Sequence, residues 1–227
     1  MSMVLALLAH DTPAGDIAMY FGYVALGVVV PGTLIWRACS PVRGGLAVDL
    51  SGGTAVGCAA EVLAYIAARA GNEPRWFLAW PLATMITFTV TPRLRRHWRV
   101  APGAWRMPAG PAWSLTGLVA VVVIWAATIL YQWHGLRWPG NANPYVDMPF
   151  HLSLVGELKH HVPPMVPQVL GEPLSYHWFV YAEMAATSWA TGIEPETLLF
   201  RLSMLPMGTA FVVLIAALGK RVTGSWW

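Results

Sequence analysis

The polar stretch 141–178, which lies between two apolar segments, holds the residues whose types could do chemistry. It contains four of the seven histidines of the chain (His151, His160, His161 and His177) and three acids (Asp147, Glu157 and Glu172). A carboxylate can accept a proton as a general base, and an imidazole can also donate or accept a proton near neutral pH. If the protein is an enzyme, we expect its reacting groups in this stretch.

Asp147 and His151 stand at the start of a run, 147–161, that has helical spacing. Apolar residues recur on one side of this run: Phe150, Leu154 and Leu158. The pattern predicts a short amphipathic helix lying on a membrane surface. Asp147 and His151 are four residues apart and therefore share a helix face, and we predict both as catalytic residues. Asp147 also stands just before Pro149, where an N-cap belongs, so the sequence leaves open whether it is a catalytic base or a cap.

Lys159 and His160 follow at the end of this helix, and Tyr176 and His177 come shortly before the next apolar segment. One interpretation of Tyr176 and His177 is that they line a substrate site. Adjacent histidines on a helix point about 100° apart, so His160 and His161 rarely bind one ion, and we predict no metal site. The alternative for Tyr176 and His177 is an aromatic belt at the membrane interface.

The composition predicts an integral membrane protein. Mean hydropathy is +0.53, and 11% of the residues are charged, whereas a soluble domain has about 25%. The net charge of +3 does not indicate nucleic acid, because the arginines cluster beside apolar segments. We expect an all-α, polytopic bundle of about six transmembrane helices, at residues 17–36, 46–68, 76–90, 113–131, 174–190 and 202–218.

The basic segment 91–106 sets the predicted topology. It carries Arg93, Arg95, Arg96, Arg99 and Arg106. The positive-inside rule makes this segment cytoplasmic, and the next span then places the loop 133–173 on the extracytoplasmic side. A phosphate or polyanion site is the alternative for the arginines. Lys220 and Arg221 would fall outside, which conflicts with the same rule and leaves the orientation of the last two spans open.

Three acids lie within the predicted spans: Asp49, Glu61 and Glu183. An acid at membrane depth is costly, and it usually faces other helices or a cavity. Small residues surround Glu61, and they allow neighbouring helices to approach closely. Glu61 is therefore either a structural, hydrogen-bonded glutamate or part of a pathway. A transporter or flippase-like subunit, with these acids lining the pathway, is the alternative to an enzyme.

The second half of the chain contains an ordered series of short patterns. After the helix 147–161 come a Pro-rich segment, Gly-x-Pro-Leu-x-Tyr-His-Trp at 171–178, Thr-Gly-Ile at 191–193, Arg-Leu-Ser at 201–203 and Leu-Gly-Lys-Arg at 218–221. In this order, after an outgoing span, they resemble the amino-terminal part of the GT-C superfamily of membrane glycosyltransferases. The resemblance covers residues 114–224, and it rests on the series because no single pattern is decisive.

The resemblance implies transfer of a sugar from a polyprenyl-phosphate donor to a glycan, lipid or protein acceptor, outside the cell membrane. It implies that Asp147 is the base and that Arg201 matches a recurrent arginine at the start of the next span, which we predict to bind substrate. The departing phosphate of such a donor needs positive charge or hydrogen-bond donors, and the resemblance makes Lys159, His160, His177 and Arg201 the candidates to bind it. A divalent cation could supply the same charge. In two respects the chain departs from the family: three spans precede the matching helix, and Asp147 is single where some relatives have an acid pair.

These predictions divide the chain into two regions. The amino-terminal region, 1–112, would contain three spans and the basic cytoplasmic loop. The second region, 113–227, would contain one span, the loop 133–173 and two further spans. Family members usually continue through several more spans, so the resemblance implies either a membrane glycosyltransferase or the amino-terminal portion of one.

Overall fold

The computed structural model describes residues 3–41, 44–100, 107–136 and 146–226. Within these ranges every regular element is a helix, as the sequence predicts, and a single β-bridge joins Met165 and Pro173. Arg106 of the basic segment and residues 137–145 of the predicted loop lie outside the described residues.

Four helices are long and apolar enough to cross a membrane, by length and composition. They are Ala14–Cys39, Leu46–Ala70, Ala109–Tyr131 and Pro195–Thr223. The predicted third and fifth spans are shorter in the structure: α5 is Ala79–Val90, preceded by the 3₁₀ turn η2 at Pro74–Leu78, and α8 is Phe179–Thr191. A spanning helix needs about 20 residues, so length alone supports four of the six predicted spans.

Several of these helices contain π-helical turns. The first consists of α2 (Ala14–Tyr23), the π-turn η1 (Val24–Val29) and α3 (Val30–Cys39). The second is α4 (Leu46–Ala70). The third consists of α6 (Ala109–Trp125) and the π-turn η4 (Ala126–Tyr131). The fourth consists of α9 (Pro195–Thr197), the π-turn η5 (Leu198–Leu202) and α10 (Met204–Thr223). The π-turn η1 lies directly before Pro31, whose missing N–H interrupts regular helical bonding.

The chain forms two compact units. The first unit comprises Met1–Tyr23, Glu61–Leu78 and Val123–Met204. The second comprises Val24–Ala60, Ala79–Val122 and Leu205–Trp227. The first unit contains α1 (Met3–Ala9) and α7 (Met148–His160), which forms where the sequence predicts a helix over 147–161.

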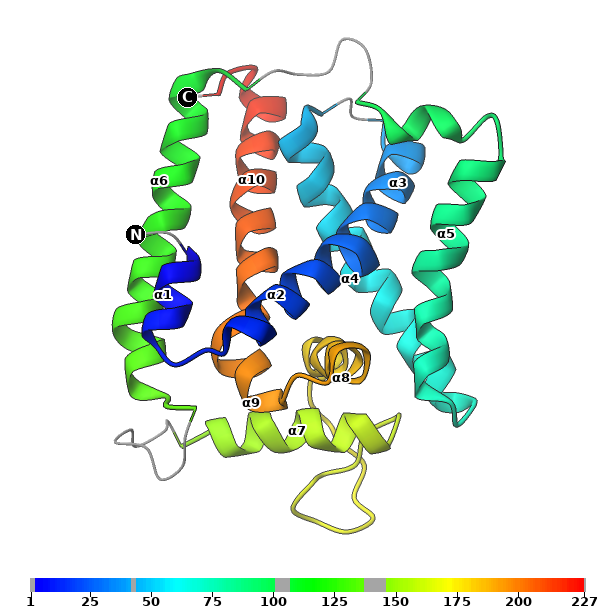
Figure 1. Cartoon of the computed structure of the whole chain (residues 1–227), viewed down its shortest axis with the longest axis vertical. Coiled ribbons are helices and arrows are strands. Elements are labelled where there is room, and N and C mark those ends of the chain that lie inside the picture. Colours follow the sequence, from blue (N-terminus) through cyan, green and yellow to red (C-terminus); the bar gives the residue numbers. More distant parts are fainter. Residues whose placement is uncertain (1–2, 42–43, 101–106, 137–145, 227) are drawn as a thin grey trace. The chain divides into compact units, whose positions relative to one another are not determined.

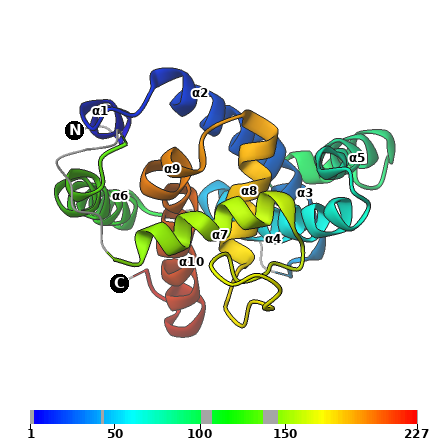
Figure 2. The same ribbon diagram turned by 90° about the horizontal axis from the view of Figure 1, so that it is seen from below.

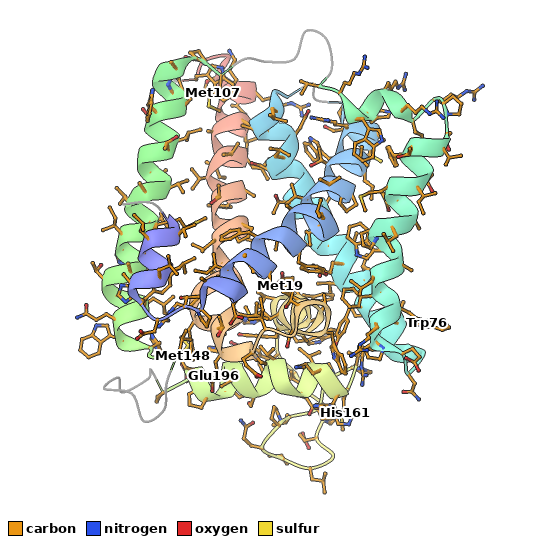
Figure 3. All side chains as sticks on the ribbon, in the orientation of Figure 1. Met19, Trp76, Met107, Met148, His161 and Glu196 are labelled. Atoms are coloured by element: carbon orange, nitrogen blue, oxygen red, sulfur yellow. The ribbon has the colours of Figure 1, made fainter. Side chains whose placement is uncertain are left out.

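In the first unit α7 crosses α8 (Figures 1 and 2). Met148 and His161 lie at opposite ends of α7 (Figure 3). The predicted apolar side packs inward, since Leu154 and Leu158 are 0% exposed. The Tyr65 hydroxyl from α4 donates to the Leu158 carbonyl at 2.8 Å. The helix 147–161 is thus a docked element of the first unit.

Replacing Leu154 with Ala should destabilise the first unit. A fully buried leucine reduced to alanine leaves a cavity and costs about 3 kcal/mol, so we expect a lower thermal unfolding temperature in detergent. Leu170→Ala is the matched control, because Leu170 is fully exposed at the tip of the following loop. Equal unfolding temperatures for the two variants would mean that α7 is not docked.

The second unit holds α3 and α4 in close contact through glycines. A Cβ built on Gly57 would lie 2.2 Å from the Val28 carbonyl oxygen, and one built on Gly53 would lie 2.6 Å from the Thr33 nitrogen. These backbones therefore touch, which confirms the predicted close approach at small residues. In the same unit Arg37 Nε donates to Asp49 Oδ2 at 2.7 Å. Asp49 is therefore held in an ion pair.

Candidate active site

Asp147 is exposed and lies directly before the first residue of α7. Its backbone occupies the N-cap position, and its carbonyl accepts a hydrogen bond from the His151 nitrogen at 3.0 Å. Its carboxylate makes no cap hydrogen bond, although the sequence suggests an N-cap at this position. The Asp147 carboxylate is therefore accessible and is not engaged in capping α7.

One helical turn further, His151 belongs to an aromatic cluster. The cluster consists of Phe150, His151, Tyr176, His177 and Tyr181. His151 Nδ1 and the Tyr181 hydroxyl share a hydrogen bond of 2.7 Å, and the two rings stack with centroids 5.6 Å apart. The rings of Tyr176 and His177 stack at 4.0 Å, and both residues are exposed. The cluster thus joins the start of α7 to the segment before α8 and presents aromatic faces at the surface.

Tyr181 was missed in the sequence because it lies within the predicted fifth span, where an aromatic residue indicates a helix core. Its spacing of four residues from His177 is the one signal that could have linked it to the cluster. Burial raises the pKa of the Tyr181 hydroxyl, and neighbouring Tyr176 raises it further. The hydroxyl therefore stays protonated at neutral pH and can act as a hydrogen-bond donor.

The structure separates Lys159 and His160 from Asp147. Twelve residues of helix rise about 18 Å, so the two ends of α7 cannot contact one small substrate group together. Lys159 Nζ donates to Ser188 Oγ at 2.9 Å and lies 5.8 Å from the ring centroid of Trp189. His160 is exposed, and its carbonyl accepts a hydrogen bond from Arg69. Lys159 thus connects α7 to α8.

Arg201, the predicted phosphate ligand, is 3% exposed. Its guanidinium donates to four backbone carbonyls: Tyr131 at 3.3 Å, His134 at 2.7 Å, Phe200 at 3.0 Å and His10 at 3.4 Å. Three of these carbonyls lie at or just beyond the carboxyl ends of helices, where the helix dipole favours a cation. The hydrogen-bonding capacity of Arg201 is thus used largely inside the protein.

Two of the three acids in the predicted spans meet in the first unit. Glu61, from α4, is 0% exposed and accepts a hydrogen bond from the Tyr23 hydroxyl at Oε1. Its Oε2 has no hydrogen-bond partner among the described residues. Glu183, from α8, is partly buried and accepts a bond from Thr187 Oγ1 at 3.3 Å. The two carboxyl groups are close enough to repel each other when both are ionised.

Because of Glu183, we expect the stability of the folded protein to depend on pH. Burial raises the pKa of Glu183, which lies outside the four candidate spans, from 4.5 to about 7. An acid whose pKa is higher in the folded state stabilises that state when protonated. This stabilisation is complete below pH 4.5 and is lost as the pH rises through 7.

We therefore expect the unfolding temperature to fall between pH 5 and pH 8, and Glu183→Gln to flatten that fall. Glu172→Gln, at an exposed position of the loop, is the control. An unchanged pH profile in Glu183→Gln would contradict the assignment of this dependence to Glu183.

Among the described residues no group of three His, Cys, Asp or Glu side chains could hold a metal ion. No set of residues is therefore assigned to a divalent cation. Comparisons of the chain with models of protein families, with curated proteins and with solved structures gave no match.

Proposed function

We propose that the protein is a membrane glycosyltransferase of the GT-C type, or the amino-terminal portion of one. It would transfer a sugar from a polyprenyl-phosphate donor to an extracytoplasmic acceptor. The observation that supports this best is the uncapped carboxylate of Asp147, one helical turn from the exposed aromatic cluster. A base beside exposed rings fits a reaction in which a hydroxyl attacks a sugar.

In this mechanism Asp147 accepts the proton of the acceptor hydroxyl while its oxygen bonds to the anomeric carbon. The bond between that carbon and the phosphate oxygen breaks, and polyprenyl phosphate leaves with the electron pair. The faces of Tyr176 and His177 offer an apolar surface against which a sugar ring can pack. The imidazoles of His151 and His177 can donate hydrogen bonds to the phosphate. Lys159, His160 and Arg201 have structural contacts and lie outside this core set.

The proposed arrangement places α7 along the extracytoplasmic surface of the cell membrane. The prenyl tail of the donor would remain in the bilayer while its phosphate reaches the interface beside α7. An amphipathic helix with one apolar side is suited to this position. Six spans, with α5 and α8 as short membrane-inserted helices, would belong to the same proposal.

The direct test is a transfer assay with the full chain in lipid vesicles. Polyprenyl-phosphate sugars with a radiolabelled sugar are supplied, and release of the label from the lipid is measured. We expect release with wild type and a strong loss in Tyr176→Ala, with Trp133→Ala as an exposed aromatic control outside the cluster. Release that is equal in wild type and in vesicles without protein, for every donor sugar, would contradict the proposal.

A transport function is the second candidate, and the proximity of Glu61 and Glu183 favours it. Asp49, the third acid of the predicted spans, is ion-paired with Arg37. Two neighbouring carboxyl groups that cannot both ionise readily can bind and release one proton. Proton uptake into vesicles, measured for wild type and for Glu61→Gln, tests this function. Uptake lost in Glu61→Gln and kept in Asp147→Asn would favour transport over sugar transfer.

A further inference from the structure

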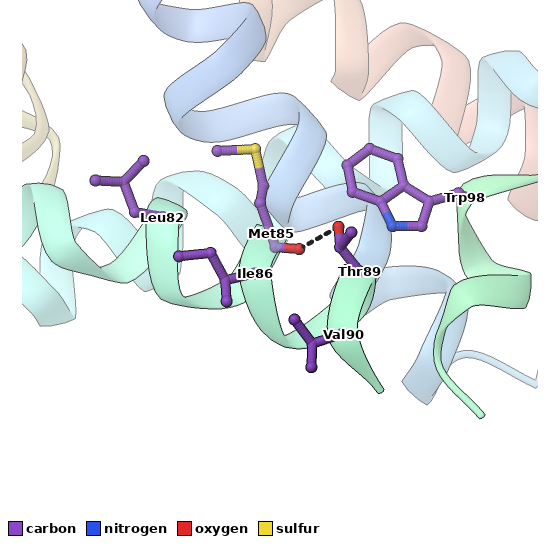
Figure 4. Close-up of a pocket in the computed structure, with 6 residues that line it drawn as sticks. All are labelled: Leu82, Met85, Ile86, Thr89, Val90 and Trp98. Carbon is purple, nitrogen blue, oxygen red and sulfur yellow. Dashed lines mark hydrogen bonds between the residues drawn. The ribbon is translucent and has the colours of Figure 1, made fainter. Parts of the chain in front are cut away.

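An apolar groove of about 290 Å³ lies in the second unit between α5 and the short 3₁₀ helix η3 (Arg95–Trp98; Figure 4). It is lined by Leu82, Met85, Ile86, Thr89, Val90 and Trp98. The first five recur every three or four residues and form one side of α5. The Thr89 hydroxyl donates to the Met85 carbonyl at 2.7 Å, which leaves no hydroxyl hydrogen for the groove.

The groove has the length and exposure to hold a hydrocarbon chain. Leu82, Ile86 and Val90 are 57%, 60% and 65% exposed, so their side chains are uncovered along the whole groove. From Leu82 to Val90 the helix rises about 12 Å. An extended apolar strip of this kind is stable in contact with acyl chains, whereas contact with water would be unfavourable.

Hydrogen bonds hold η3 against α5 and so fix one end of the groove. Trp98 Nε1 donates to the Phe88 carbonyl at 3.3 Å, and Arg95 Nε donates to the Thr89 carbonyl at 2.7 Å. Arg37 Nη1, from α3, donates to the His97 carbonyl at 3.0 Å. The indole wall and the Arg95 guanidinium therefore have defined positions at the end of the apolar strip.

This end of the groove is positively charged. Arg93, Arg95, Arg96 and Arg99 are all exposed. None of the four has a carboxylate within salt-bridge distance among the described residues. Clustered arginines next to an apolar surface attract anionic lipid headgroups. The charge and the groove together match an amphiphile with a hydrocarbon tail and an anionic head.

We propose that this groove binds one acyl chain of an anionic phospholipid and that Arg95, Arg96 and Arg99 hold the lipid phosphate. The bilayer itself supplies this ligand, so the site needs no soluble partner. The bound lipid would cover the exposed side of α5, which at 12 residues is short for a transmembrane helix. The site is independent of the proposed sugar transfer.

The test is native mass spectrometry of the full chain in detergent, with phosphatidylglycerol and phosphatidylcholine of identical acyl chains. We expect phosphatidylglycerol to bind more tightly. Arg96→Gln combined with Arg99→Gln should weaken its binding about 25-fold, at about five-fold for each arginine. This pair leaves the hydrogen bond of Arg95 in place. Lys220→Gln with Arg221→Gln removes the same charge from the end of α10, and binding should stay within about two-fold of wild type.

A second variant tests the groove separately from the charge. Ile86→Trp fills the groove and should weaken phosphatidylglycerol binding, whereas Leu118→Trp, on the exposed side of α6, should not. Three outcomes would each overturn the proposal. They are equal affinity for the two lipids, an equal loss in the Lys220/Arg221 control, and unchanged binding in Ile86→Trp.

Discussion

Asp147→Asn is expected to fold normally and to lose about 10²–10⁴-fold of the transfer rate, which is the usual contribution of a general base. The amide keeps the size of the carboxylate but cannot accept the proton of an acceptor hydroxyl. Radiolabel transfer from a polyprenyl-phosphate sugar measures the rate. Binding of the donor lipid, measured in parallel, should be unchanged because the base acts on the acceptor.

Asp147→Ala separates catalysis from helix capping. An N-cap replaced by alanine costs about 1 kcal/mol of stability. The Asp147 carboxylate makes no cap hydrogen bond, so we expect Asp147→Ala to unfold within about 0.5 kcal/mol of wild type and to lose transfer as completely as Asp147→Asn. Glu172→Gln removes an exposed carboxylate from the following loop and should retain full activity. Wild-type turnover in Asp147→Asn would exclude it as the base and direct the search to His151 or Glu61.

The sequence predicted α7 well because its determinants are local. Phe150, Leu154 and Leu158 recur at helical spacing, and the structure buries Leu154 and Leu158 within the first unit. The same pattern could not reveal the state of the Asp147 side chain. Capping depends on the rotamer of one side chain. Asp is common at N-cap positions, but this preference does not show whether a particular carboxylate reaches the helix nitrogens.

The contacts of Lys159 and Arg201 could not be predicted because their partners are distant in the sequence. Lys159 bonds to Ser188, 29 residues away, and Arg201 reaches the carbonyls of His10, Tyr131 and His134, which are 191, 70 and 67 residues away. Any residue type can supply a backbone carbonyl, so no residue pattern marks these partners. The family resemblance suggested Arg201 as a phosphate ligand, and in the fold its guanidinium donates to backbone carbonyls.

The number of spans was less predictable from the sequence than the fold class. High hydropathy and few charged residues suffice to predict an all-helical membrane protein. The limits of α5 and α8, however, depend on local breaks. α8 ends at Gly192, which has a positive φ of 75°, and α5 follows the 3₁₀ turn that begins at Pro74. Such breaks shorten apolar segments that would otherwise suffice to span a bilayer.

Arg201→Met is expected to destabilise the first unit by about 5 kcal/mol. Methionine has a similar length but makes none of the hydrogen bonds to the four carbonyls. Each charge-assisted bond contributes about 1.5–3 kcal/mol, and the contributions of one side chain are not fully additive. The substitution also removes the guanidinium donor from the carbonyls of Tyr131 and His134. We expect a large fall in folded yield and in thermal unfolding temperature in detergent.

Arg201→Lys distinguishes this structural role from phosphate binding. Lysine keeps the positive charge, so a residue that only attracts phosphate should tolerate it with much of the stability and activity retained. The ammonium group cannot reproduce the planar guanidinium, whose three nitrogens reach four carbonyls in different directions. We therefore expect Arg201→Lys to unfold at a clearly lower temperature than wild type, while Arg221→Lys, at an exposed position of α10, leaves it unchanged. A normally stable Arg201→Lys protein with weakened donor-lipid binding would instead assign Arg201 to the substrate phosphate.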